Sequence, residues 1–254
     1  MKLTIDTDAR TIHTEDGAGI VDLYSSEAFE LLSDVWLKVG WQQRYSYQFT
    51  WMGRPVIQLP EDLLRLQEVI FSVRPRVIVE TGVAHGGSLV FHAAMLKAMG
   101  GGRVVGVDIE IRPQNRRALE DHELGADIDL VEGDSAAADV VATVERLVAG
   151  EEPVLVVLDS DHSRAHVARE LEAYAPLVSP GSYLVATDGV MQDLHDVPAG
   201  ERAWKADNPV EATKEFLTRH PEFELVDWAP PFNESMVTTQ LTYWPSAWLR
   251  KRAH

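Results

Sequence analysis

The sequence predicts an α/β fold in which a mostly parallel sheet carries helices on both faces. Short apolar runs alternate with helical segments between about residues 77 and 186, with short connections. These runs are continuous stretches of Val, Ile and Leu, as is typical of parallel strands buried on both sides. Near the end of the chain two strand-like segments follow each other without a helix between them, which predicts an antiparallel pair. We therefore expect a seven-stranded sheet with one reversed strand.

Each expected element follows from a local pattern. Apolar runs predict the strands Val77–Val79, Val104–Val107, Ile128–Val131, Val154–Leu158, Tyr183–Ala186, Phe223–Asp227 and Gln240–Trp244. Segments between them predict the helices Gly86–Met99, Arg116–Leu124, Ser135–Val148, Ser163–Tyr174 and Asn208–His220. A run of basic residues, Arg250 to Arg252, is expected in a solvated tail.

The first sixty residues differ in character from the rest. Apolar residues at helical spacing predict a helix from Ser26 to Val39. An aromatic-rich segment follows, with Trp41, Tyr45, Tyr47, Phe49 and Trp51. Pro60 then opens a helix that runs to about Val73. We expect residues 1–60 to form an N-terminal extension that covers substrate, mediates oligomer contacts, or both, and residues 61–254 to form the main domain.

Composition narrows the function. The net charge of −17 repels phosphate backbones, so nucleic acid is not an expected partner. No apolar run approaches the roughly 20 residues that span a bilayer. The chain has no cysteine, which excludes thiolate metal sites and a cysteine nucleophile. The first residues carry no apolar signal segment, and a cytoplasmic location is the expectation.

A glycine-rich loop follows the first strand of the main domain. Its glycines let the backbone approach a ligand, and the helix that it opens offers free N–H groups. With Gly82, Gly86 and Gly87 the spacing is G-x-x-x-G-G, which is not the dinucleotide fingerprint. Preceded by an acid, this spacing resembles the loop of S-adenosylmethionine-dependent methyltransferases. The expected cofactor-binding residues here are Glu80, Thr81, Gly82, Gly86 and Ser88.

The next two strand ends carry polar residues as well. Asp108 ends the second strand, where a carboxylate binds ribose hydroxyls in related sheets. Asp134 and Ser135 follow the third strand, where an adenine amino group would lie. Either acid alone also suits a helix cap, as does Ser135. Three such features at successive strand ends favour bound S-adenosylmethionine, since ligands of open α/β sheets bind outside the carboxyl ends of the strands.

The fourth and fifth strand ends carry a candidate metal site. Asp159, Asp161 and His162 follow the fourth strand, and Asp188 follows the fifth. Because these ends lie at the same edge of the sheet, we expect the carboxylates to converge. Carboxylate ligands without cysteine suit a hard cation such as Mg²⁺. Asp161 also suits a helix cap, and His162 also suits an unpartnered residue of a first helical turn.

The motif VIVETGVAHGGS followed by LDSDHS resembles the cephalosporin hydroxylase-like family. That family includes metal-dependent sugar O-methyltransferases of antibiotic biosynthesis, notably rhamnosyl O-methyltransferases, and the similarity runs from about Trp51 onward. It implies a Rossmann-like class I methyltransferase fold, S-adenosylmethionine as cofactor and self-association into a homo-oligomer. It also implies that Asp159 is a metal ligand, His162 the catalytic base and Asp188 a second ligand.

The chain departs from the family at one place. Related enzymes often carry two adjacent acidic or amide ligands after the fifth strand, whereas Thr187 and Gly189 flank Asp188 here. The third protein ligand is therefore open, and Asp161 is the candidate. In the implied mechanism the metal lowers the pKa of a sugar hydroxyl, His162 accepts its proton, and the oxygen attacks the methyl group in line.

The stretch from Val190 to Asn208 is long and polar, as functional loops are. Together with aromatic residues of the N-terminal extension it is expected to cover the acceptor. The candidates for acceptor contact are His195, Tyr47, Trp51 and Trp204. The alternative is packing of these aromatic residues against the domain or another subunit, which is favoured for Trp36 and Trp41.

Two other functions stay open from the sequence. The first is a non-haem iron oxygenase, which usually requires two histidines and a carboxylate; His195 is the only nearby second histidine. The second is a binding module that keeps the cofactor loop and has lost its chemistry. The small-molecule acceptor itself cannot be read from the chain.

Overall fold

The computed structural model describes residues 2–15, 19–226 and 232–253. A seven-stranded sheet forms its centre, in the order β11-β12-β10-β9-β6-β7-β8. Its strands are β6 (Val77–Thr81), β7 (Arg103–Asp108), β8 (Ile128–Glu132), β9 (Val154–Leu158), β10 (Tyr183–Ala186), β11 (Phe223–Leu225) and β12 (Trp248–Lys251). β12 runs antiparallel to both of its neighbours, and the adjacent pairs from β10 to β8 are parallel. The predicted mostly parallel sheet with one reversed strand is confirmed.

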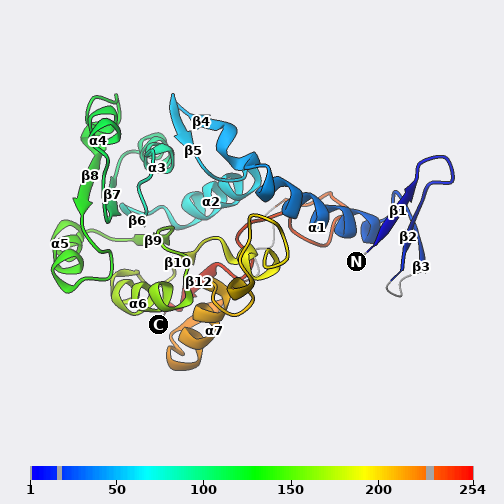
Figure 1. Cartoon of the computed structure of the whole chain (residues 1–254). Coiled ribbons are helices and arrows are strands. Elements are labelled where there is room, and N and C mark those ends of the chain that lie inside the picture. Colours follow the sequence, from blue (N-terminus) through cyan, green and yellow to red (C-terminus); the bar gives the residue numbers. More distant parts are fainter. Residues whose placement is uncertain (1, 16–18, 227–231, 254) are drawn as a thin grey trace.

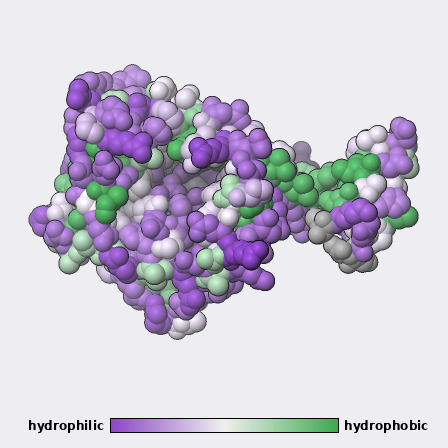
Figure 2. Space-filling view, in the orientation of Figure 1, coloured by the Kyte–Doolittle hydropathy of each residue, from purple (hydrophilic) through white to green (hydrophobic). Residues whose placement is uncertain are grey.

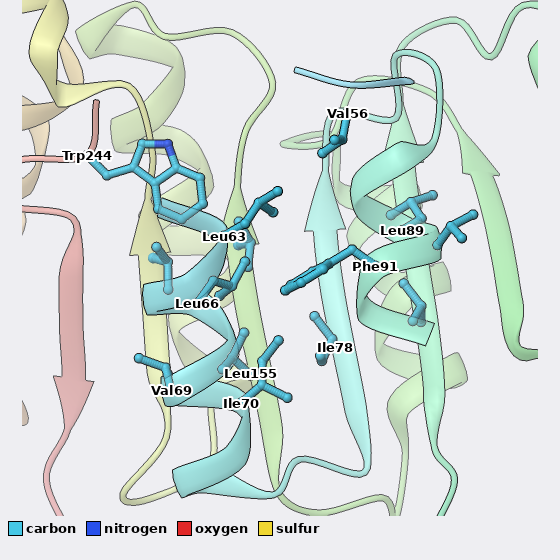
Figure 3. Packing of buried hydrophobic residues seen from close by; sticks show 14 of the residues in the cluster. Val56, Leu63, Leu66, Val69, Ile70, Ile78, Leu89, Phe91, Leu155 and Trp244 are labelled. Atoms are coloured by element: carbon cyan, nitrogen blue, oxygen red, sulfur yellow. The ribbon is translucent and has the colours of Figure 1, made fainter. Parts of the chain in front are cut away.

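Helices cover both faces of the sheet (Figure 1). They are α2 (Pro60–Val73), α3 (Gly87–Ala98), α4 (Pro113–Glu120), α5 (Ala138–Val148), α6 (Arg164–Tyr174) and α7 (Pro209–Arg219). Side chains of α2 and α3 pack with Ile78 and Leu155 on one face, as Figure 3 shows. Helices α5, α6 and α7 pack on the other face with Val77 and Val79. Successive residues of a strand point to opposite faces, so one apolar run serves both halves of the core.

The N-terminal part projects from this body (Figure 1). Helix α1 (Ser26–Gln42) leads to the 3-10 helix η1 (Tyr45–Gln48) and the hairpin β4 (Phe49–Trp51) and β5 (Arg54–Val56). A small antiparallel sheet of β1 (Leu3–Asp6), β2 (Thr11–Thr14) and β3 (Gly19–Asp22) lies at the far end of α1. The helix was predicted from the sequence, whereas this sheet was not; each of its strands is only four residues long.

Several expectations about local structure were wrong; for example, α5 begins at Ala138 rather than at Ser135. The last strand is Trp248–Lys251, not Gln240–Trp244. In the latter stretch the carboxylate of Asp62 accepts the backbone N–H of Tyr243 at 2.9 Å, so this group does not join a strand ladder. Arg250 and Lys251, which were expected in a solvated tail, belong to this last strand. Helix α4 begins at Pro113, three residues before the expected start, because proline suits a first helical turn. Asp227 lies outside the described residues.

The long segment after β10, expected as a polar loop, contains short helices. It holds the 3-10 helices η4 (Gly189–Asp193) and η5 (Arg202–Lys205). Lys38 of α1 binds Asp196 at 2.8 Å, and the backbone N–H of Ala199 donates to the side chain of Gln42 at 2.7 Å. This segment therefore fastens the body-side end of α1. No helix among the described residues combines the length and apolar character needed to cross a membrane.

Candidate active site

Three side chains converge where β9 and β10 end. One ligand atom from each of Asp159, His162 and Asp188 lies within 4.8 Å of the others, and each residue is partly exposed. The Nε2 atom of His162 is 3.2 Å from a carboxylate oxygen of Asp188. β9 and β10 are parallel neighbours, so their carboxyl ends meet at one edge of the sheet. The structure thus brings together three of the four residues that the sequence singled out for metal and base chemistry.

The backbone turns sharply at Asp188. Its φ is 54°, in the left-handed region that Asp tolerates better than most residues. The turn lies between the end of β10 and the 3-10 helix η4. Uncommon backbone conformations of this kind concentrate at functional sites, where the surrounding structure holds them.

Asp159 is held from three sides. Its backbone N–H donates to the carbonyl of Thr81 at 2.9 Å. The hydroxyl of Thr187 donates to one carboxylate oxygen, and the side-chain amide of Gln58 donates to the other at 3.3 Å. Burial and the neighbouring charge of Asp188 raise the pKa of Asp159 well above its usual range. Burial likewise raises the pKa of Asp188. Two carboxylates held this close favour a shared cation or proton.

Asp161 does not join this group. Its side chain accepts the backbone N–H of Ser163 at 2.8 Å, just before α6, and the residue is exposed. Hydrogen bonding from the side chain of Ser163, together with this backbone bond, lowers the pKa of Asp161. The geometry is that of a residue that supports a helix start.

The glycine loop packs tightly against both neighbouring segments. A Cβ atom on Gly82, whose φ is 91°, would lie 2.0 Å from the carbonyl oxygen of Asp159. A Cβ atom on Gly87 would lie 2.1 Å from the carbonyl oxygen of Pro55. The loop is therefore clamped between the end of β9 and the N-terminal strand β5. A pocket lies in this region, lined by Pro55, Ile57, Gln58, the loop from Gly82 to Ser88, and Asp159.

Glu80 and Thr81 lie behind the loop and are completely buried. One carboxylate oxygen of Glu80 accepts the hydroxyl of Ser88 at 2.5 Å, and the other lies 2.5 Å from Nε2 of His92. Both oxygens therefore have partners within the protein. Glu80 holds the helix that the loop opens, and the structure does not bring it to the pocket lining.

Asp108 shapes the same loop from the other side. One of its oxygens accepts the backbone N–H groups of Val83 at 2.8 Å and Ala84 at 3.2 Å, and the other accepts that of Glu110 at 3.1 Å. The residue stays partly exposed at the end of β7.

The residues after β8 belong to a separate network. Asp134 binds Arg169 at 2.8 Å, and this hydrogen bond lowers the pKa of the carboxyl. The buried hydroxyl of Ser135 donates to Glu170 at 2.5 Å and lies 3.1 Å from His166. These contacts join β8 to α6 beside the carboxyl edge of the sheet.

The four residues expected at the acceptor lie in different surroundings. Trp51 packs edge-on against Phe91 with 5.0 Å between ring centroids. Trp204 packs edge-on against Trp41 at 6.1 Å. Tyr47 is 57% exposed on η1. His195 is partly buried, and its Nδ1 lies 2.9 Å from the carbonyl oxygen of Gln192. Of these four, Trp51 and Trp204 have mainly packing contacts.

Sequence reasoning missed Gln58, which binds Asp159 from the N-terminal extension. A signal was present: Gln58 is the lone polar side chain between Val56 and Leu59, in a stretch that otherwise reads as buried.

Comparison with known proteins places this geometry in context. The chain is 32% identical over 142 residues to "Rhamnosyl O-methyltransferase" of Mycobacterium leprae (strain TN), covering 55% of this chain and 59% of that protein. It is equally similar to the protein of that name from Mycobacterium tuberculosis (strain ATCC 25618 / H37Rv), of which it covers 56%. The matched region thus spans less than two thirds of these relatives.

Two solved structures share the fold at lower identity. A structure described as "cmcI-D160 Mg-SAM" gives a TM-score of 0.53 at 18% identity, covering 82% of this chain and 78% of that one. A MycE methyltransferase from the mycinamycin biosynthetic pathway, in complex with Mg and SAH, gives 0.51 at 18% identity, covering 85% of this chain and 54% of that one. These neighbours support a class I methyltransferase fold. The family model described as "Rhamnosyl O-methyltransferase/CmcI" matches residues 43–252, and the chain therefore belongs to this family.

Proposed function

We propose that the protein is an S-adenosylmethionine-dependent and Mg²⁺-dependent O-methyltransferase that acts on a hydroxyl of a sugar or glycosylated small molecule. The convergence of Asp159, His162 and Asp188 beside the glycine-loop pocket carries the proposal. The names of the relatives support the reaction type, and the Mg-SAM and Mg-SAH complexes of the structural neighbours support the cofactors.

The donor set fits a hard divalent cation. Asp159 and Asp188 offer carboxylate oxygens from two adjacent strand ends, and Asp161 is a further ligand only if its turn rearranges. The proximity of the two carboxylates is unfavourable without a compensating positive charge, and this favours cation binding. A bound cation would lower the pKa of an acceptor hydroxyl. Vicinal hydroxyls chelate in pairs, which favours a sugar as acceptor.

His162 serves as the base in this proposal. An imidazole nitrogen is a common general base for a proton transfer of this kind. Asp188, 3.2 Å from Nε2, orients the ring and stabilises the imidazolium that proton transfer creates. Asp159 and Thr187 hold the adjacent wall of the site, so that the oxygen and the methyl donor meet in a fixed geometry.

The cofactor is proposed to lie along the carboxyl edge. The loop residues Gly82, Gly86 and Ser88 bring backbone and helix N–H groups to it, while Glu80 and Thr81 support the loop from behind. Asp108 is proposed to face the ribose. Asp134 and Ser135 are proposed to flank the adenine, with Arg169 and Glu170 holding them in place.

We assign residues 1–60 the roles of acceptor cover and oligomer contact, next to a main domain of residues 61–254. Tyr47, Trp51, Trp204 and His195 are the proposed acceptor contacts, with Tyr47 the most exposed of the three aromatic residues. Secondary metabolism, including antibiotic biosynthesis, is the proposed setting, supported by the pathway named for MycE. A cytoplasmic location is proposed because the cysteine-free chain needs no oxidising compartment.

Self-association is proposed through α1. Its exposed apolar residues include Phe29, which is 40% exposed, and Val39, which is 55% exposed. Figure 2 shows apolar residues gathered along this projecting arm. Such contiguous apolar surface marks interaction sites. Light scattering coupled to size exclusion tests this: a monomer at micromolar concentration contradicts it, and loss of the oligomer in Val39→Glu supports it.

The oxygenase alternative receives no support from the site. The group within 4.8 Å contains two carboxylates and one histidine, and across residues 2–15, 19–226 and 232–253 no second histidine joins it. The nitrogen Nδ1 of His195 instead lies beside the carbonyl of Gln192.

Calorimetric titration tests the proposal directly. We expect micromolar binding of both S-adenosylmethionine and S-adenosylhomocysteine, followed by Mg²⁺-dependent methylation in a screen of nucleotide sugars and glycosides. EDTA should abolish turnover, and added Mg²⁺ should restore it. If neither cofactor form binds with or without Mg²⁺, the proposal fails.

A further inference from the structure

One buried side chain connects the glycine-loop pocket to the metal-ligand candidates. Gln58 lies between β5 and α2, is 4% exposed and lines the pocket together with the loop and Asp159. Its Nε2 donates to Oδ2 of Asp159 at 3.3 Å. This contact uses the donor end of the amide, so Oε1 is the end left for a different partner.

The other end of the amide is unpaired. Oε1 of Gln58 is buried and has no hydrogen-bond partner in the part of the chain that the structure describes. An orphaned buried carbonyl is costly, and such groups in folded proteins are usually paired with protein, water or ligand. Since the residue lines the pocket, a bound hydrogen-bond donor would satisfy this atom.

The start of α3 also lines this pocket and offers a complementary group. Helix α3 begins at Gly87, and no side chain caps its N-terminus. The first N–H groups of a helix lack intrahelical acceptors and bind anions. The pocket thus pairs a hydrogen-bond acceptor with anion-binding N–H groups, which is the pattern that matches an amino acid with free ammonium and carboxylate groups.

The proposed cofactor carries such an end. Resting on the function proposed above, we infer that Oε1 of Gln58 accepts a hydrogen bond from the α-ammonium of the methionyl end, while the α-carboxylate meets the start of α3. Gln58 then acts as a positioning residue for Asp159 as well, because one amide holds both groups. Cofactor binding and the orientation of the Asp159 carboxylate become coupled, and such coupling is reciprocal.

Calorimetry with paired ligands tests this inference. S-adenosylhomocysteine carries the amino-acid end, and 5′-methylthioadenosine lacks it. In Gln58→Met we expect affinity for S-adenosylhomocysteine to fall about tenfold or more, as loss of a hydrogen bond to a charged group implies. Affinity for 5′-methylthioadenosine should change less than about twofold, since this ligand does not reach the amide. Gln48→Met, at an exposed glutamine of η1, is the matched control and should leave both affinities unchanged.

The outcomes separate the two proposals. If the wild-type protein binds neither ligand, the proposed function fails. If the wild type binds both and Gln58→Met weakens both equally, or neither, the function stands and the inference about Gln58 is overturned. A test without any variant uses the des-amino analogue of S-adenosylhomocysteine on the wild-type protein. Its affinity should be about tenfold weaker, and equal affinity contradicts the inference.

The mutual effect of Mg²⁺ and S-adenosylhomocysteine on their binding affinities gives a further test. A purely structural role of Gln58 would leave this effect unchanged. In the wild type, saturating S-adenosylhomocysteine should tighten Mg²⁺ binding severalfold, and Mg²⁺ should tighten ligand binding by the same factor. Gln58→Met should reduce both factors toward one. Undiminished coupling in the variant contradicts the link through this amide.

Discussion

Two of the carboxylate–histidine pairs in the described part of the chain differ in burial and in their surroundings. Glu80 and His92 are both fully buried, and each oxygen of Glu80 has its own partner. Asp188 and His162 are each about a fifth to a quarter exposed, and a second carboxylate, Asp159, lies beside them. Both oxygens of Glu80 are paired within the protein, although Nδ1 of His92 has no hydrogen-bond partner among the described residues, whereas the second pair is accessible to a ligand. Chemistry is therefore expected at the pair that solvent can reach and that has a second carboxylate beside it.

Asp159→Asn gives the largest expected effect, because it removes a charge from the open cluster. Methyl transfer at a fixed Mg²⁺ concentration should fall by about 10³-fold, which corresponds to several kcal/mol of lost metal-assisted stabilisation. Asp161→Asn changes the same residue type two positions away and should retain activity within about threefold. Equal losses in both variants would assign Asp161 a place among the ligands. Initial rates across a Mg²⁺ titration decide this.

His162→Gln tests the base in the same cluster. The rate of methyl transfer should fall by about 10²-fold or more, the usual range for a lost general base. Affinity for S-adenosylhomocysteine should be unchanged, since His162 faces Asp188 rather than the glycine loop. Full activity at neutral pH would remove His162 from the mechanism.

Glu80→Gln probes the closed pair and should affect stability rather than chemistry. One of the two buried contacts loses its charged acceptor, and the free energy of unfolding should fall by about 2–3 kcal/mol. Well below the unfolding temperature, affinity for S-adenosylhomocysteine should stay within about threefold. Urea unfolding and calorimetry measure the two quantities. A stable variant that no longer binds the ligand would place Glu80 in the cofactor site and erase the contrast between the two pairs.

Another buried carboxylate, that of Asp62, makes the stability of the protein depend on pH. Burial raises the pKa of Asp62 to about 7, although Thr242 and Tyr243 donate to it. The folded state therefore holds this proton more tightly than the unfolded state, whose carboxyl has an ordinary pKa. The stabilisation is complete below about pH 4 and is lost as the pH rises through 7.

Between pH 5 and 7 this group should lower the free energy of unfolding by about 2 kcal/mol. Asp62→Asn should remove that part of the pH dependence, so the stability difference between wild type and variant should shrink as the pH rises. A difference that stays constant from pH 5 to 7 would show that Asp62 keeps an ordinary pKa in the folded state.

Much of the fold could be predicted from the sequence, because patterns of neighbouring residues indicate its strands and helices. Continuous apolar runs marked β6 to β10, and parallel topology then placed Asp159 and Asp188 at one edge. The position of β12 was not readable, because Tyr243 and Trp244 are as apolar as a strand. The backbone N–H of Tyr243 instead donates to Asp62, 181 residues away in sequence, and that of Trp244 donates to the hydroxyl of Thr242. The role of Gln58 was not predicted for the same reason, because it depends on a contact with Asp159, which is 101 residues away in sequence.

The place of β12 in the sheet constrains how the chain can fold during synthesis. Residues 248–251 lie between β10 and β11, and Leu249 at its centre is fully buried. Both neighbouring strands emerge from the ribosome first, yet they are joined in the finished sheet only through this late segment. The half of the sheet from β8 to β10 can assemble while translation continues, since domains fold as their chain becomes available. β11 can join the sheet only after β12 has been synthesised. Until then the free edge of β10 exposes unpaired backbone groups, which can pair with a wrong strand.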